Sequence, residues 1–130
     1  MPTKVTSLLL CDDVRKEASG KDILIGVYSG SIDVTAYPAM FPLMLWIEFE
    51  PEKLGDSPIR VQIDTPSGNP PIKFSAEMEV VIVETSVLIM GPLPITVERD
   101  GEILISMQFG DGPMEVVKRK QVRRRQASQS

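Results

Sequence analysis

The sequence contains no histidine, and Cys11 is its single cysteine among 130 residues. The lack of histidine excludes Ser-His-Asp and Cys-His catalytic triads, together with every zinc or iron site that needs an imidazole ligand. One cysteine can form neither an intramolecular disulfide nor a cysteine-only metal site. We therefore expect a protein that is not an enzyme, that holds no cofactor and that resides in a reducing, cytoplasmic compartment.

Long apolar runs and helical patterns are also scarce. No stretch approaches the roughly 20 apolar residues that a membrane span requires, so we expect no membrane association. The short apolar run before Cys11 is followed at once by two aspartates, which favours a first strand over a signal peptide. No segment has a helix-length apolar stripe, and one or two helical turns within residues 13–18 are the best helical candidate.

Strand patterns, in contrast, cover most of the chain. Period-two alternation or dense β-branched runs predict strands at residues 4–10, 23–29, 43–49, 59–65, 73–83, 86–90 and 93–109, with a short last strand at 114–118. Most of the 9 glycines and 11 prolines fall between these runs, where turns are expected. The pattern predicts an all-β fold: a single antiparallel β-sandwich, immunoglobulin-like or related, with seven to eight strands.

Residues 93–109 have the pattern of a β-hairpin. A two-residue turn at Asp100-Gly101 would place the apolar faces of its two strands in conflict, because a one-residue slip moves every side chain to the other face. A three-residue loop with Gly101 in the left-handed region instead places Ile95 opposite Ile105 and Val97 opposite Ile103. We therefore predict the three-residue loop.

Charge is distributed unevenly along the chain. All 18 acidic residues precede Lys118, whereas six of the 14 basic residues lie in the short segment 118–125. Residues 1–117 thus carry 8 basic and 18 acidic side chains, a net charge of −10, and residues 118–130 carry +6. We predict a β-sandwich domain at 1–117 and a basic, flexible tail at 118–130.

The basic segment is a candidate nucleic-acid contact. Its cations suit the phosphate backbone, but no aromatic residue lies among them, so neither base stacking nor sequence specificity is expected. Two alternatives are open, since the tail could fold back on the acidic body or only keep the protein soluble. The six residues are Lys118, Arg119, Lys120, Arg123, Arg124 and Arg125.

Asp12 and Asp13 form a candidate calcium site just after the first strand. Loop carboxylates at one end of a sandwich can ligate calcium through their oxygen atoms. The alternative is an exposed loop whose acids pair with the neighbouring Arg15 and Lys16. Cys11 beside them is either a reactive thiol or, as its place at the end of a strand favours, a buried apolar side chain.

Met44 and Trp46 lie on the face of residues 43–49 that is opposite the fully apolar one. Either this strand is covered on both sides, or Trp46 is an exposed anchor for a partner protein. Since no catalytic group is evident, we favour a non-catalytic interaction module that acts through a protein partner or as a homo-oligomer. Sequence-independent nucleic-acid binding by the tail and calcium binding at Asp12 and Asp13 are the alternatives.

The opening of the chain resembles a known family. Residues 8–17 (LLLCDDVRKE) and 20–30 (GKDILIGVYSG) are similar to the start of a family of short, uncharacterised bacterial and prophage proteins. The resemblance covers about residues 4–50 well and residues 93–107 loosely, and the basic tail lies outside it. It implies a bacterial, cytoplasmic setting and transfers no catalytic residue, because the family has no assigned activity.

Overall fold

The computed structural model describes residues 3–52, 54–80 and 84–125. These residues form ten strands and no helix, so the predicted all-β fold is confirmed and no helix of the described ranges could cross a membrane. The short helix predicted within residues 13–18 is instead a strand at residues 13–16 followed by a turn. The strands are β1 (Lys4–Cys11), β2 (Asp13–Lys16), β3 (Asp22–Ile25), β4 (Ile32–Val34), β5 (Ala39–Glu50), β6 (Gly55–Asp64), β7 (Ile72–Val80), β8 (Ser86–Val97), β9 (Gly101–Phe109) and β10 (Glu115–Arg124).

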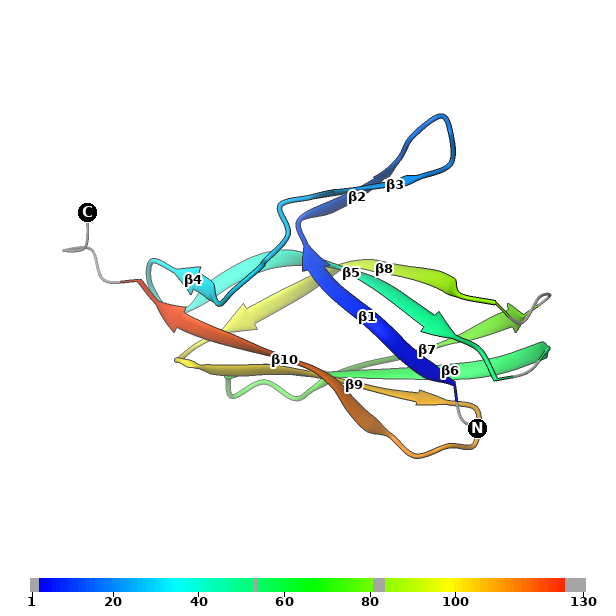
Figure 1. The fold of residues 1–130 in the computed structure, drawn as a ribbon. Helices are drawn as coiled ribbons and strands as arrows, with labels where there is room; N and C mark the ends of the chain where they lie inside the picture. Colours follow the sequence, from blue (N-terminus) through cyan, green and yellow to red (C-terminus); the bar gives the residue numbers. More distant parts are fainter. Residues whose placement is uncertain (1–2, 53, 81–83, 126–130) are drawn as a thin grey trace.

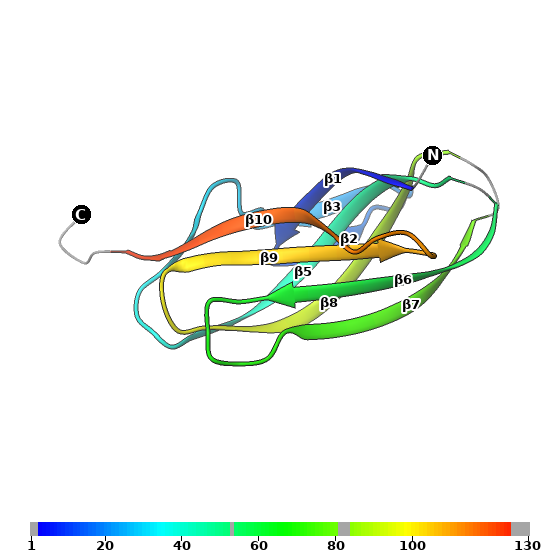
Figure 2. The same cartoon turned by 90° about the horizontal axis from the view of Figure 1, so that it is seen from below.

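The strands are arranged in three sheets. A three-stranded sheet has the order β1-β5-β8, and a five-stranded sheet has the order β4-β10-β9-β6-β7. These two sheets lie one over the other (Figure 1), and Figure 2 shows the five-stranded sheet from below. β4 pairs with β10 in parallel and the other pairs are antiparallel. β2 and β3 form a separate hairpin that stands out from the body (Figure 1).

The apolar core lies between the two larger sheets. Alternate residues of each strand point inward, which is the period-two pattern that the sequence shows. Leu45 and Ile47 of β5 are fully buried, as are Ile63 of β6 and Ile103 and Ile105 of β9. One cluster of buried side chains contains all five, so both sheets contribute to a single core.

The hairpin predicted at residues 93–109 is wrong. β8 pairs with β5, whereas β9 pairs with β6 and β10, so Ile95 and Ile105 belong to different sheets. Gly101 is not in the left-handed region, although a Cβ atom there would approach Pro66 to 2.8 Å. Alternation gives the same inward residues whether two strands pair or face each other across a core, and the sequence cannot distinguish these arrangements.

Two other strands differ from their predicted extents. The strand predicted at residues 23–29 ends at Ile25, because Gly26 adopts a positive φ of 69°. The strand predicted at residues 86–90 continues to Val97 as β8, through an irregularity in its pairing with β5. With β2 and β4 added, the described residues contain ten strands rather than seven or eight.

The basic segment is not a flexible tail over the part that the structure describes. β10 extends to Arg124, and Val122 within it is fully buried. Because β10 pairs with β9 and with β4, it is an interior strand of its sheet, and the predicted domain boundary at residue 117 falls inside it. Residues 126–130 of the predicted tail lie outside the described residues.

Candidate functional site

Neither Met44 nor Trp46 is freely exposed, and Trp46 contacts the chain's own β2–β3 hairpin. Met44 is 9% exposed and Trp46 is half-buried on the outer face of β5. The indole Nε1 of Trp46 donates a hydrogen bond to Oδ2 of Asp22 in β3, at 2.9 Å. Trp46 is therefore tied to the β2–β3 hairpin, and it is not the freely exposed aromatic anchor that one interpretation of the sequence predicts.

Asp22 connects this contact to an ion pair. Its Oδ1 lies 2.6 Å from Nζ of Lys16 on the paired strand β2. The Lys16 ammonium, and secondarily the Trp46 indole, hold the pKa of Asp22 below its usual value. The pKa of Asp22 is lower in the folded protein than in the unfolded chain. Ionised Asp22 therefore stabilises the fold at pH values above the pKa of the unfolded chain. This contribution is lost as the pH falls through the pKa of the folded protein.

Replacement of Trp46 by phenylalanine tests the hairpin contact. The ring is kept but the N–H donor is lost, so a largely buried carboxylate oxygen of Asp22 loses a partner. We expect about 1–3 kcal/mol of destabilisation in urea unfolding followed by circular dichroism, and faster amide exchange in residues 13–25. Asp22→Asn keeps an acceptor for the indole, so we expect amide exchange in residues 13–25 to be slower in this variant than in Trp46→Phe. Unchanged exchange in Trp46→Phe would show that the hydrogen bond does not hold the hairpin.

The structure gives no support to calcium binding at Asp12 and Asp13. Oδ1 of Asp12 accepts a hydrogen bond from the Tyr28 hydroxyl at 3.1 Å. Asp13 accepts the Val14 N–H through Oδ1 and pairs with Arg15 Nε through Oδ2, both at 2.9 Å. In the described part of the chain, no group of three or more acidic, cysteine or histidine side chains could hold a metal ion. The pairing of Asp13 with Arg15 is the alternative that the sequence left open.

Cys11 follows the second interpretation of the sequence. It is fully buried at the end of β1, and burial, reinforced by the nearby Asp12 and Asp13 carboxylates, raises the pKa of its thiol. A raised pKa disfavours the thiolate, which is the reactive form. Cys11 is therefore a buried side chain that contributes to packing at the end of β1.

The strand geometry of β10 divides the basic segment between two faces. Successive side chains of a strand point to opposite sides. Lys118 and Lys120 lie opposite the buried residues Ile105 and Ile103, so they share the inner face. Arg119 and Arg123 lie on the outer face. The six positive charges that are adjacent in the sequence consequently do not form one continuous patch.

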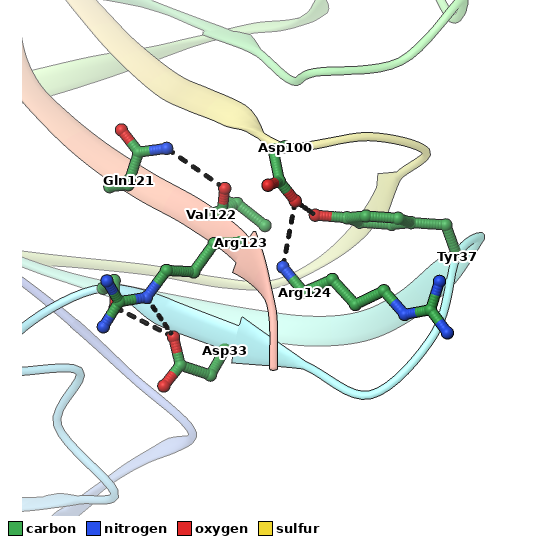
Figure 3. Close-up of polar contacts among 8 residues, drawn as sticks. Asp33, Tyr37, Asp100, Gln121, Val122, Arg123 and Arg124 are labelled. Carbon is green, nitrogen blue, oxygen red and sulfur yellow. Dashed lines mark hydrogen bonds and ion pairs between the residues drawn. The ribbon is translucent and has the colours of Figure 1, made fainter. Parts of the chain in front are cut away.

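Acidic partners occupy the outer arginines. Arg123 Nε lies 3.0 Å from Asp33 Oδ1 of the neighbouring strand β4 (Figure 3). Arg119 lies 3.8 Å from Glu102 on β9. A Ser31 hydrogen bond and the Arg123 guanidinium lower the pKa of Asp33. Both ion pairs are solvent-exposed, so each contributes little stability, but each already neutralises a cation that phosphate binding would use.

The end of β10 is fixed by a third carboxylate. Asp100 Oδ1 accepts the backbone N–H of Arg124 at 2.9 Å and the hydroxyl of Tyr37 (Figure 3). These two hydrogen bonds lower the pKa of Asp100, while burial and the Asp100 carboxylate raise the pKa of Tyr37 to about 12. Asp100 thus anchors the basic strand to the β8–β9 connection. Asp100, which the sequence predicts as a loop residue, thus holds the end of β10 in place.

Lys120 is a buried cation on the inner face of β10. It is 8% exposed, and its Nζ donates a hydrogen bond to the carbonyl oxygen of Tyr28. Burial and, less strongly, the like charge of Lys118 lower the pKa of Lys120. Because Tyr28 N–H in turn donates to Leu10 O at 2.8 Å, the Tyr28 segment links β10 to β1. Lys120 is therefore a structural residue and not an accessible phosphate ligand.

The apolar residues that the structure leaves exposed were not predicted as a site. Ile23 and Ile25 of β3 and Met40 of β5 are 41%, 45% and 77% exposed. Alternation in the strand predicted at residues 23–29 puts the two isoleucines on one face, but it does not show that this face is exposed to solvent. The exposed apolar position of Met40 could have been suspected from the sequence, because residues 40–46 contain no charged side chain on either face of the strand.

The fold and these surfaces define an all-β domain built around one two-sheet core, with a projecting hairpin. A family model described as a family of unknown function (DUF6941) matches residues 6–118, and the chain belongs to that family. The predicted membership of an uncharacterised family is thereby confirmed. The match ends within β10, so the arginines at 119 and 123–125 lie beyond it. No curated protein matches the chain.

Proposed function

We propose that this protein is a non-catalytic, immunoglobulin-like interaction module that binds a protein partner through the outer face of the sheet β1-β5-β8. The observation that carries the proposal is the exposed apolar area where β5 and β8 pair on that face. The outer face of an antiparallel sheet is ordinarily polar, because it contacts water. An exposed apolar area on a soluble domain is typical of a binding surface.

Strand order supports the immunoglobulin-like assignment. Without β2, β3 and β4, seven strands remain, with the first, second and fifth in one sheet and the third, fourth, sixth and seventh in the other. An immunoglobulin constant domain has the same division except that its fourth strand joins the first sheet. β7, the fourth strand here, pairs instead with β6 at the edge of the five-stranded sheet.

The cross-strand pairs of β5 and β8 give the apolar face its composition. Residues directly opposite each other share a face, and Pro42 lies opposite Pro94 while Met40 lies opposite Thr96. Both prolines are exposed, and Met40 is 77% exposed. A shallow depression of about 390 Å³ is lined by these residues together with Pro92 and Leu93. We call Met40, Pro42, Pro92 and Pro94 the Met40 patch.

The five-stranded sheet provides the internal comparison. Four outward-facing pairs around β6 are polar: Arg60 lies opposite Gln108 and Ser75, and Gln62 lies opposite Ser106 and Lys73. The outer face around β6 is thus polar, as is usual for a face that contacts water, whereas the outer face at the Met40 patch is apolar. Because proline has no backbone N–H and cannot donate to a further strand, the Met40 patch suits side-chain contact with a folded surface and not strand addition.

A photo-activatable cross-linker at position 40 tests this function in the native host, with position 62 on the polar face as the matched control. We expect position 40 alone to trap a defined partner. With that partner purified, Met40→Lys should weaken its binding at least about tenfold in calorimetry, whereas Gln62→Lys should not. Equal trapping at both positions, or unchanged affinity of Met40→Lys, would contradict the proposal.

Nucleic-acid binding by the basic segment is less well supported. Arg119 and Arg123 have carboxylate partners and Lys120 is buried, so Lys118, Arg124 and Arg125 remain as cations for phosphate. Acidic side chains also lie among them on the same sheet. A phosphate-binding surface depends on concentrated positive charge, and this arrangement disperses it.

A further inference from the structure

One edge of β3 has no neighbouring strand in the part of the chain that the structure describes. Among residues 3–52, 54–80 and 84–125, the sheet that contains β3 has two strands, and β2 pairs with one edge of β3. Figure 1 shows the hairpin projecting from the body, with no further strand beside β3. An unpaired strand edge presents backbone N–H and C=O groups that can pair with another chain.

Backbone pairing within the hairpin shows which groups face that edge. Glu17 N–H donates to Lys21 O at 2.8 Å, and the register continues with Arg15 opposite Ile23. Hydrogen-bonded and non-hydrogen-bonded pairs alternate along an antiparallel ladder. Ile23 and Ile25 therefore direct their backbone groups toward β2, and Leu24 between them directs its N–H and C=O outward.

β3 lacks the protection that other edges of this protein have. Charged side chains, prolines and bulges ordinarily prevent strand addition. The edge strand β7 has Lys73 and Glu77, and the edge strand β8 has Pro92 and Pro94. β3, in contrast, reads Asp-Ile-Leu-Ile, and Asp22 is already engaged by Lys16 and Trp46.

We propose that two copies of this protein associate by antiparallel pairing of β3 with β3 of the second copy, about a two-fold axis at Leu24. The segment Ile23-Leu24-Ile25 reads the same in both directions, which is the self-complementarity that a two-fold contact requires. Each Ile23 then lies opposite an Ile25, and Leu24 lies opposite Leu24. The resulting sheet has four strands, more than the two that are marginal alone.

Charge is compatible with this register. Asp22 is the single charged residue of β3, and the two-fold pairing places it opposite Gly26 of the second copy, so the two Asp22 carboxylates are not opposed. The β-branched isoleucines form two cross-strand pairs on the outer face of the hairpin, where they are 41% and 45% exposed. This dimer contact does not use the Met40 patch, so either surface can bind without the other.

Sedimentation velocity of the full chain over a wide concentration range tests the dimer. We expect the wild-type protein to dimerise and Ile23→Lys/Ile25→Lys to raise the dissociation constant at least about tenfold. The matched control is Val87→Lys/Val116→Lys, because those valines are similarly exposed (41% and 45%) and lie outside the hairpin. Persistent dimers in the isoleucine variant, or a monomeric wild type at every concentration, would overturn the proposal.

A cysteine at the axis tests the register without disturbing the charge. In a Cys11→Ala background, Leu24→Cys should give a disulfide-linked dimer on mild oxidation, since opposite residues of paired strands are within disulfide reach. Val27→Cys, which lies beyond the end of β3, should remain monomeric under the same conditions. Equal cross-linking of both variants would reject the β3 register. Loss of binding at the Met40 patch would leave this result unchanged, so the two proposals fail separately.

Discussion

Ile105→Ala is expected to lower the free energy of unfolding by about 2–5 kcal/mol. Ile105 is fully buried at the middle of β9, and it lies opposite Ile63 of β6 within the shared core. The two sheets pack on this layer from both sides, so the space left by the removed side-chain carbons cannot close without moving a strand. Lost apolar burial and a residual cavity therefore both contribute to the effect.

Leu104→Ala is the matched control for this prediction. Leu104 is the preceding residue of β9 and points to the outer face, where it is half-buried. We expect its substitution to cost markedly less in the same urea titration, with an unchanged dependence on denaturant concentration. Similar losses for the two variants would mean that the inward and outward faces of β9 are assigned incorrectly.

Gly91→Ala is expected to be the most damaging small substitution outside the core. Gly91 has φ of 124°, a conformation that costs about 1–3 kcal/mol for a residue with a side chain. A Cβ atom there would also lie 2.7 Å from the carbonyl oxygen of Leu43 and 2.9 Å from Sδ of Met44. Overpacking adds about 1–3 kcal/mol, because the nearest atom belongs to the backbone of β5 and cannot rotate away.

Gly55→Ala separates these two contributions. Gly55 also has a positive φ, 108°, but a Cβ atom there would meet nothing within 4 Å. We expect Gly55→Ala to show the conformational cost alone, and Gly91→Ala to lose clearly more stability in thermal unfolding. If the two variants were equally stable, close approach between β5 and β8 at Gly91 would not constrain the fold. The same site positions Pro92 and Pro94, so Gly91→Ala should also weaken partner binding through the Met40 patch.

The sequence by itself determined the fold class and most of the core. Alternation in residues 43–49 and 59–65 predicts which side chains point inward, and the structure buries Leu45, Ile47, Ile59 and Ile63 fully. Apolar residues at period two can be shielded from water only on one face of a strand, so this part of the fold follows from local pattern. The turns between strands follow for the same reason from glycine and proline.

Tertiary structure alone decided which strands pair. Ile95 and Ile105 are buried in either arrangement, but only the tertiary structure assigns β8 and β9 to different sheets. The basic segment shows the same limit, because its charges suggest a solvated tail until pairing with β9 and β4 places Val122 in the core. Charge along a chain does not show that alternate side chains will face an interior.

The candidate surfaces depended on tertiary structure for the same physical reason. Met44 and Trp46 could be identified from their side of β5, yet only the tertiary structure shows that Met44 is buried and that Trp46 is hydrogen-bonded to the β2–β3 hairpin. Ile23 and Ile25 have a strand pattern that is typical of burial, and they are exposed because none of the described elements packs on the outer face of the hairpin. A side chain's type is fixed by the sequence, whereas its exposure depends on segments distant along the chain.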